Sequence, residues 1–179
     1  HKLKEQWHHT AHGHLWRGSV QAATEQLIEA TVEFPDCGMA YKLLGDLYRE
    51  EASKLQAKQD TWQAELIRST DSYSAAIAKF RASRQLTSAP VDAGPTSAAI
   101  QLETDLRYCI TWRGVNNTRL QRPDLAIEDF QVLVTEFDEC ARDILVRFGD
   151  CHFATRMYAA SWQAFNDVVE RHPKCSMAY

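Results

Sequence analysis

Glycine and proline are scarce in this sequence: its 179 residues include 7 glycines and 5 prolines, and none of them lies between Gly45 and Pro90. Because turns and strand ends of β-proteins draw heavily on these residues, the scarcity argues against a sandwich or a barrel. There is also no run of about 18 uncharged apolar residues, so we expect no membrane insertion. These absences favour a protein built from long helices.

Positive charge is also in short supply, since 20 Lys and Arg residues face 24 Asp and Glu residues and give a formal net charge of −4. Proteins that hold a polyanion usually carry a basic excess, so nucleic acid and anionic lipid are disfavoured as partners. The five cysteines are odd in number and form no Cys-x-x-Cys pair, which argues against a disulfide framework or a zinc knuckle. Free thiols predict an intracellular, reducing compartment, with cytosol and mitochondrial matrix both open.

Sequence signatures of catalysis are missing as well. The chain has no Gly-x-Gly-x-x-Gly, Walker, Gly-x-Ser-x-Gly or His-Glu-x-x-His pattern. One histidine cluster, His8, His9, His12 and His14, places His8 and His12 one helical turn apart, where a metal would need a third ligand such as Glu5. A half-exposed helix with ordinary histidines is the simpler interpretation. The sequence therefore predicts no enzyme, no cofactor, no metal site and no small-molecule substrate.

Internal repeats are present. Residues 35–41 recur as residues 173–179 with five of seven positions identical. Ser161 and Phe165 follow Gly149 at +12 and +16, and Ala126 and Phe130 follow Gly114 at the same offsets. Because His1 is no initiator residue and Tyr179 ends a repeated motif, we expect a processed or partial chain whose end is covered by further structure or by a partner subunit.

These offsets match the tetratricopeptide repeat, which reads W-x2-L-G-x2-Y, then A-x3-F, then P, with a period of about 34 residues. Residues 44–48, Leu-Gly-Asp-Leu-Tyr, complete the L-G-x2-Y part, whereas Asn117 or His152 replaces the tyrosine in later copies. The chain resembles the tetratricopeptide family over nearly its whole length. The resemblance implies an all-α, right-handed solenoid of antiparallel helix pairs. It implies a single domain over 1–179, with repeats at 4–37, 38–90, 97–141 and 142–175, a loop at 87–96 and the start of a further repeat at 176–179.

The second repeat contains an insertion. Gly45 reaches its matching alanine, Ala76, at +31 instead of +12, which predicts an insertion of length 19. The inserted segment is rich in helix formers, so it should lengthen both helices into a protruding hairpin with its tip near residues 59–61. Trp62 and Leu66 lie near one stripe of the second helix. They either seal the hairpin or form a docking contact for a partner.

The resemblance also implies a binding surface, because the first helix of each tetratricopeptide pair lines a concave groove. By register, the first pair contributes His8, His9 and His12. The remaining groove residues are Met39, Lys42, Leu43, Asp46, Arg49, Tyr108, Thr111, Trp112, Val115, Asp143, Val146, Arg147 and Asp150. Tyr108 and Trp112 would either anchor a partner helix or extended segment, as aromatic residues do at many interfaces, or pack against the hairpin.

The function predicted from these features is a non-catalytic scaffold for protein–protein interaction, as a fragment or subunit of a larger assembly. An architectural subunit of an organelle complex, with the hairpin as its contact, is an alternative. An RNA-binding helical repeat is less favoured, because Asp46, Asp143 and Asp150 would face the groove and repel phosphates. The same carboxylates disfavour capture of a partner's terminal carboxylate, for which only Lys42 and Arg147 remain.

Overall fold

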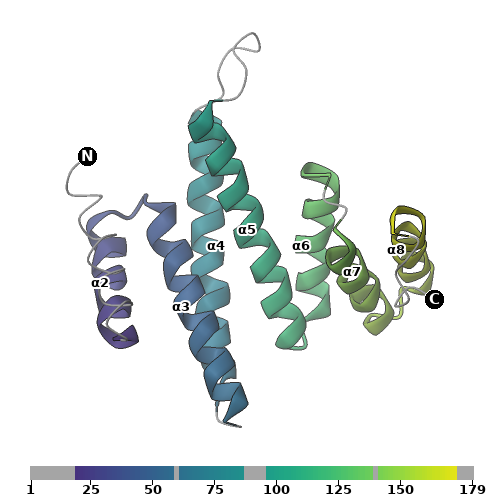
Figure 1. Cartoon of the computed structure of the whole chain (residues 1–179), viewed down its shortest axis with the longest axis horizontal. Helices are drawn as coiled ribbons and strands as arrows, with labels where there is room; N and C mark the ends of the chain where they lie inside the picture. The colour runs from purple at the N-terminus through teal and green to yellow at the C-terminus, as the bar shows by residue number, and fades with distance from the viewer. Residues whose placement is uncertain (1–18, 59–60, 87–95, 139–140, 173–179) are drawn as a thin grey trace. The chain divides into compact units, whose positions relative to one another are not determined.

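A computed structural model describes residues 19–58, 61–86, 96–138 and 141–172. Within these ranges the chain is all-helical, with seven helices and no strand (Figure 1). The helices are α2 (Val20–Glu33), α3 (Gly38–Ala57), α4 (Gln63–Leu86), α5 (Ser97–Arg119), α6 (Pro123–Glu136), α7 (Arg142–Ala154) and α8 (Tyr158–Arg171). The all-α fold of paired helices predicted from the sequence is thereby confirmed.

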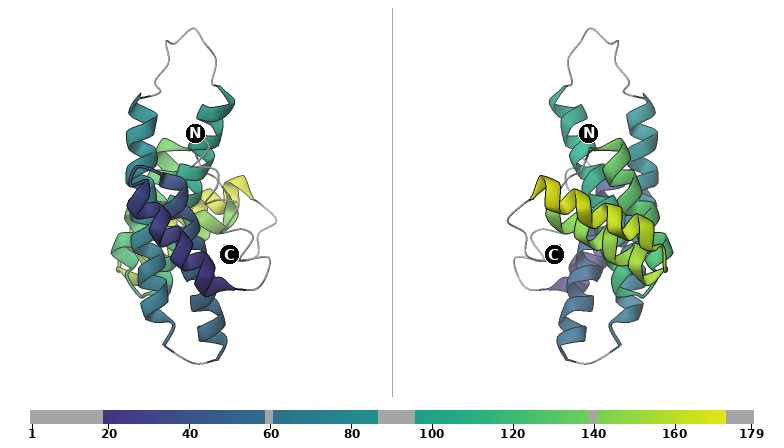
Figure 2. Two further views of the ribbon diagram at one scale, coloured as in Figure 1. Left: turned by 90° about the vertical axis from the view of Figure 1, so that its left-hand side faces the viewer. Right: turned by 90° about the vertical axis from the view of Figure 1, so that its right-hand side faces the viewer.

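The chain divides into two compact units, with the boundary inside α5. Unit 1 comprises His1–Cys109 and unit 2 comprises Ile110–Tyr179. In unit 1, α2 packs on α3 and α3 packs on α4; in unit 2, α6 packs on α7 and α7 on α8 (Figures 1 and 2). None of the described helices is long and apolar enough to cross a membrane.

Several predictions concern residues outside the described ranges. These are the first helix of the first repeat with its histidines His8, His9, His12 and His14, most of the loop at 87–96, and the start of a further repeat at 176–179. Within the described ranges, no group of three or more His, Cys, Asp or Glu side chains is placed to hold a metal ion.

Three helix pairs contain a glycine that lies against an aromatic ring of the second helix. A Cβ atom built on the glycine would come within 2.7–2.9 Å of the ring at Gly45 and Tyr73, Gly114 and Phe130, and Gly149 and Phe165. Carbon atoms in favourable contact are about 3.5–4.0 Å apart, so a side chain at these positions would push the helices apart. The three glycines therefore have equivalent surroundings, as the shared repeat register predicts.

The extended hairpin is present in unit 1. The helix α3 has 20 residues and α4 has 24, against 14 for α2, and Figure 1 shows α3 and α4 running antiparallel past the end of α2. The insertion is shorter than predicted, however. Tyr73 follows Gly45 at +28, whereas Phe165 follows Gly149 at +16, so the insertion has a length of 12 and not 19.

The error in the predicted insertion has a geometric cause. Phe80, which completes the A-x3-F pattern, packs against Gly38 and not against Gly45. Gly38 precedes Gly45 by seven positions, and Phe80 follows Tyr73 by seven, which is close to two helical turns. Both glycine–aromatic contacts therefore lie on the same helix faces, and the A-x3-F pattern matches Phe80, whose contact lies two turns away from Gly45.

A serine hydrogen bond supports the corrected register. The Ser69 hydroxyl donates a hydrogen bond to the Gly45 carbonyl oxygen at 2.7 Å. Ser69 precedes Tyr73 by four positions, just as Ser161 precedes Phe165 in the last pair. Ser69 is therefore the counterpart of Ser161, and Tyr73 is the counterpart of Phe165.

Candidate functional site

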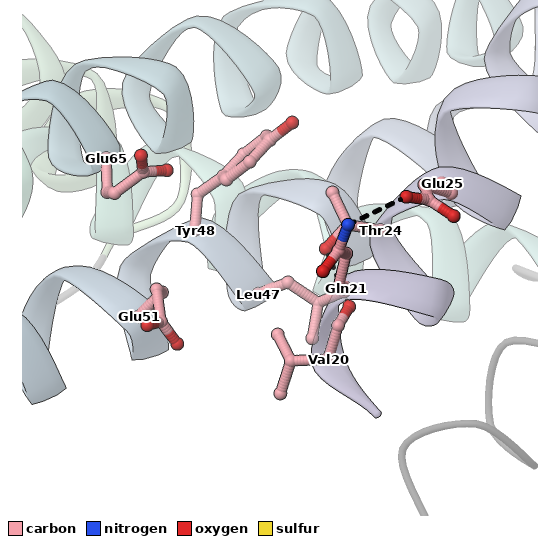
Figure 3. A pocket seen from close by; sticks show the side chains of 8 residues that line it. All are labelled: Val20, Gln21, Thr24, Glu25, Leu47, Tyr48, Glu51 and Glu65. Atoms are coloured by element: carbon pink, nitrogen blue, oxygen red, sulfur yellow. Dashed lines mark hydrogen bonds between the residues drawn. The ribbon is translucent and has the colours of Figure 1, made fainter. Parts of the chain in front are cut away.

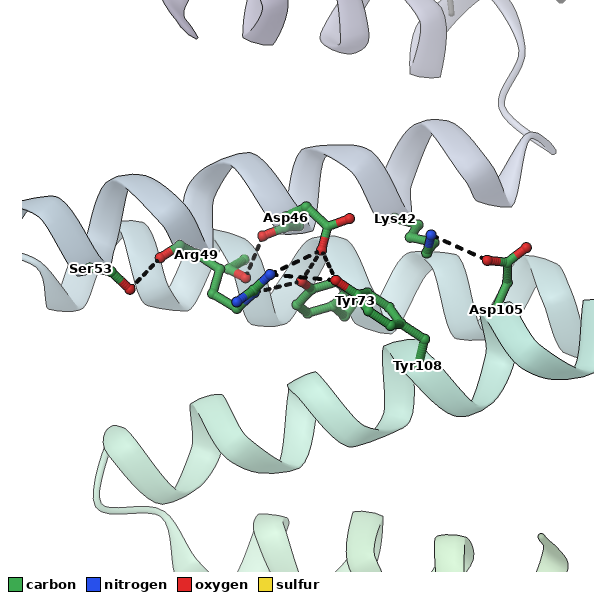
Figure 4. Close-up of polar contacts among 9 residues, drawn as sticks. Lys42, Asp46, Arg49, Ser53, Tyr73, Asp105 and Tyr108 are labelled. Carbon is green, nitrogen blue, oxygen red and sulfur yellow. Dashed lines mark hydrogen bonds and ion pairs between the residues drawn. The ribbon is translucent and has the colours of Figure 1, made fainter. Parts of the chain in front are cut away.

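Six polar side chains of unit 1 meet where α3 lies beside α4 and α5 (Figure 4). One stripe of α3 provides three of them, because residues separated by three or four positions share a helix face. We call this set the α3 polar cluster: Lys42, Asp46 and Arg49 from α3, Tyr73 from α4, and Asp105 and Tyr108 from α5.

Asp46 is the centre of the cluster. Its Oδ1 atom accepts hydrogen bonds from the hydroxyls of Tyr73 at 2.7 Å and Tyr108 at 2.8 Å. Arg49 donates to the same two hydroxyl oxygens, from Nε to Tyr73 at 3.2 Å and from Nη2 to Tyr108 at 3.4 Å. Each tyrosine hydroxyl thus donates to the carboxylate and accepts from the guanidinium, so the ring of hydrogen bonds is closed.

Lys42 also has its partners within unit 1. Its Nζ lies 3.2 Å from Oδ1 of Asp105 and 4.7 Å from the centre of the Tyr108 ring, which is close enough for a cation–π contact. The Asp105 side chain is 7% exposed and also accepts a hydrogen bond from Gln101 at 3.1 Å. The charges of the α3 polar cluster are therefore compensated within unit 1.

Burial and charge shift the pKa of the two tyrosines. Burial, together with the hydrogen bond and the charge of Asp46, raises the pKa of Tyr108 from the usual 10 to about 12, against the opposing effect of Arg49. The same causes raise the pKa of Tyr73 further. Burial alone would lower the pKa of Arg49, but its contacts with Tyr73, Tyr108 and Asp46 raise it.

The Tyr108 shift predicts a loss of stability at high pH. Since the folded chain holds this proton more tightly than the unfolded chain, the stabilisation is complete below pH 10 and disappears as the pH rises through 12. Urea unfolding of the wild type at pH 9 to 12 should show this decline, and Tyr108→Phe should make it shallower, leaving the part that comes from Tyr73. Tyr158→Phe, which removes an exposed hydroxyl, is the control and should leave the slope unchanged. Equal slopes for the wild type and Tyr108→Phe would contradict the assignment.

The structure brings together four of the predicted groove residues, Lys42, Asp46, Arg49 and Tyr108, but their polar groups are engaged in contacts among α3, α4 and α5. Two other predicted groove residues in unit 1 are half-buried: Met39, and Leu43, which packs against the core formed by Ala23, Leu27, Leu44 and Leu47. Leu43 therefore contributes to packing more than to a surface.

In unit 2 the predicted groove residues divide into two sets. Val115 is buried, and Thr111 and Trp112 are half-buried. Asp143, Arg147 and Asp150 line a surface pocket of about 220 Å³ together with Arg142 and Val146, and they are accessible to a partner.

The two hairpin residues also differ from each other. Trp62 is half-buried, but Leu66 is fully buried and offers no side-chain surface for docking. Of the two roles considered, sealing the hairpin fits Leu66.

An ion pair between α5 and α6, in which only the carboxylate is buried, was not anticipated from the sequence. Asp129 is 2% exposed and accepts hydrogen bonds from Nε of Arg113 at 3.0 and 3.1 Å. Burial raises the pKa of Asp129, although Arg113 opposes the rise. The two residues immediately precede Gly114 and Phe130, so the repeat register could have indicated this pairing.

A cluster of exposed apolar side chains in unit 2 was also not anticipated. At the turn between α7 and α8, Phe153 is 63% exposed, Met157 51%, Tyr158 58% and Trp162 69%. The rings of Phe153 and Tyr158 meet edge to face, 5.7 Å apart. We call these four residues the α7–α8 patch. Tyr158 and Trp162 are one helical turn apart and lie off the buried stripe of α8, which is formed by Ser161, Ala164 and Val168.

Comparison with known proteins gives similarity at the level of structure only: no family model matches the chain, and no curated protein does. One similar solved structure is the MamA protein, with a TM-score of 0.41 at 11% identity, covering 96% of this chain and 92% of that one. A tetratricopeptide repeat protein from Parabacteroides merdae has a TM-score of 0.35 at 19% identity, covering 100% and 70%. The chain is similar to tetratricopeptide-repeat structures.

A further match is the TPR domain of P58(IPK), with a TM-score of 0.38 at 12% identity. The match covers 98% of this chain but only 62% of that structure. This chain thus spans less than two thirds of the length of that structure. The assignment of helix pairs depends on the glycine–aromatic contacts within each unit and not on these low TM-scores.

Proposed function

We propose that this chain is a non-catalytic scaffold that binds another protein through the α7–α8 patch, as part of a larger assembly. The exposure of these four side chains, two of which have their rings in contact, supports the proposal. Contiguous exposed apolar surface is costly in water and commonly marks a site of protein–protein interaction. Trp and Tyr are also the side chains that most often dominate binding energy at such sites.

The α7–α8 patch suits a protein partner better than the α3 polar cluster does. Lys42, Asp46 and Arg49 already make ion pairs and hydrogen bonds within unit 1, so a partner would have to break these contacts before it could use them. Such exchanges between polar groups yield little net free energy. Burial of Trp162 and Tyr158 against a partner would instead remove their apolar surface from water, which stabilises the complex. The pocket lined by Asp143 and Arg147 remains a proposed peptide contact of its own.

The proposal is tested by affinity purification with the full chain and a patch variant, Tyr158→Ser combined with Trp162→Ser. Partners retained by the wild type should be recovered about tenfold less with this variant, because exposed aromatic anchors contribute on the order of 1–2 kcal/mol. Leu125→Ser removes another partly exposed apolar side chain of unit 2 and should bind normally. Arg147→Glu reverses a charge in the pocket lined by Asp143 and Arg147 and tests whether the partner binds there. Undiminished recovery with the patch variant, together with loss in Arg147→Glu, would move the binding site to the groove.

We also propose an intracellular, reducing location. Cys37 and Cys151 are free thiols, and Cys151 is buried. Buried reduced cysteine packs as a small apolar side chain. Burial also raises the pKa of the Cys151 thiol, with Thr118 opposing the rise, which keeps the thiol protonated and unreactive.

A further inference from the structure

A groove in unit 1 results from the length difference between α2 and the hairpin. The helix α2 begins at Val20, beside Leu47 and Tyr48 of α3, and α3 continues to Ala57. Because the insertion extends α3 and α4, their side chains form a ledge next to the first turns of α2. The ledge encloses about 290 Å³ (Figure 3). We call this space the ledge groove.

The ledge groove combines an apolar floor with an acidic rim. Val20, Leu47 and Tyr48 are among its lining residues, and most of the lining surface is apolar. Three carboxylates, one from each helix, stand around this floor: Glu25 from α2, Glu51 from α3 and Glu65 from α4. The ligand that complements such a surface has an aliphatic stem and a positively charged end, as arginine and lysine side chains do.

The polar contacts within the groove leave negative charge in excess. Glu65 is paired with Arg68 at 3.0 Å, and the Arg68 guanidinium lies 5.9 Å from the centre of the Tyr48 ring. Glu25 accepts a hydrogen bond from the neutral amide of Gln21 at 3.1 Å. Lys54 lies near Glu51 but is paired with Glu50 at 2.8 Å. Counting Lys54 together with Arg68, the three rim carboxylates still outnumber the nearby positive charges among the described residues.

Arg68 also shows how a guanidinium can bind at this groove. It pairs with a rim carboxylate and lies over Tyr48, and these are the two contacts that favour arginine over lysine at such sites. A second guanidinium, supplied in trans, would find Glu25 on the other side of the floor from Glu65, with Glu51 on the same side as Glu65 (Figure 3). Its methylene groups would cover Val20 and Leu47.

We propose that the ledge groove binds an arginine side chain from a basic segment of a partner protein. The stem displaces water from the apolar floor, and the guanidinium pairs with a rim carboxylate, Glu25 or Glu51. The α7–α8 patch belongs to the other unit and takes an apolar partner surface, so each proposal can fail without the other.

The test uses the full chain, labelled for NMR, and the acetylated, amidated peptide Ala-Leu-Arg-Ala as probe. We expect shifts of the Val20 and Leu47 methyl groups and of the Tyr48 ring, with a dissociation constant on the order of 1 mM. The matched peptide with citrulline in place of arginine keeps the shape but not the charge, and it should bind at least about fivefold more weakly.

The protein variants give a second comparison. Combining Glu25→Gln with Glu51→Gln should weaken binding about fivefold without loss of helix content, because neither side chain is buried. Glu33→Gln removes the same charge from the other end of α2 and should leave binding unchanged. Equal binding of the arginine and citrulline peptides, no effect of the double variant, or no shifts at the groove would each overturn the proposal. An absence of shifts at the groove is also the result expected if another part of this chain already occupies it.

Discussion

Replacing Tyr73 with alanine is expected to lower the free energy of unfolding of unit 1 by about 3–5 kcal/mol, the cost of removing a large buried aromatic side chain. Tyr73 is fully buried, and its ring is the surface against which Gly45 packs. Alanine would leave a cavity between α3 and α4, and Asp46 and Arg49 would each lose a hydrogen-bond partner. Urea unfolding followed by hydrogen exchange of α3 and α4 amides measures the loss.

The control for this prediction is Tyr73→Phe. It keeps the ring, and Asp46 keeps its hydrogen bond from Tyr108, so we expect a cost of only about 1 kcal/mol. A large cost of the alanine variant with a small cost of the phenylalanine variant means that the ring, more than its hydroxyl, joins α3 to α4. Equal costs for the two variants would mean that the polar cluster is the main link.

The repeat register was the part of the fold that could be predicted from sequence. A glycine at a helix contact and an aromatic residue at +16 depend on local geometry, which is why Gly114 and Gly149 were correctly matched to Phe130 and Phe165. The same reasoning gave the wrong aromatic residue in the hairpin, because two residues seven positions apart lie on nearly the same face of a helix. Only the packed structure shows that Gly45 meets Tyr73.

The candidate sites were less predictable, because they depend on how helices pack side by side. Register placed Lys42, Asp46 and Arg49 on one face of α3, and this was correct. It could not show that Asp105 and Tyr108 would lie opposite and engage that face. The α7–α8 patch was missed for a related reason. Periodicity indicates which stripe of a helix is buried, but it does not show which apolar side chains outside that stripe stay uncovered.

The glycine–aromatic contacts predict an unusual response to alanine. In most helix positions Gly→Ala stabilises by about 1 kcal/mol, because glycine is a poor helix former. At Gly114 the added methyl group would lie 2.9 Å from the Phe130 ring and 3.1 Å from Cβ of Asp129, both of them buried, so we expect destabilisation of about 1–3 kcal/mol. Gly149→Ala should cost less, because Phe165 is only half-buried and its ring has room to move.

The central claim is that these contacts are equivalent links that hold each helix pair together, and double-mutant cycles test it most directly. Gly114→Ala is combined with Phe130→Leu, and the analogous pairs are made at Gly45 and Gly149. In each cycle the smaller side chain should relieve the clash, so that the double variant is more stable than the sum of the single costs by about 1 kcal/mol or more. Additive costs in all three cycles, or an alanine at Gly114 that stabilises unit 2, would contradict the account.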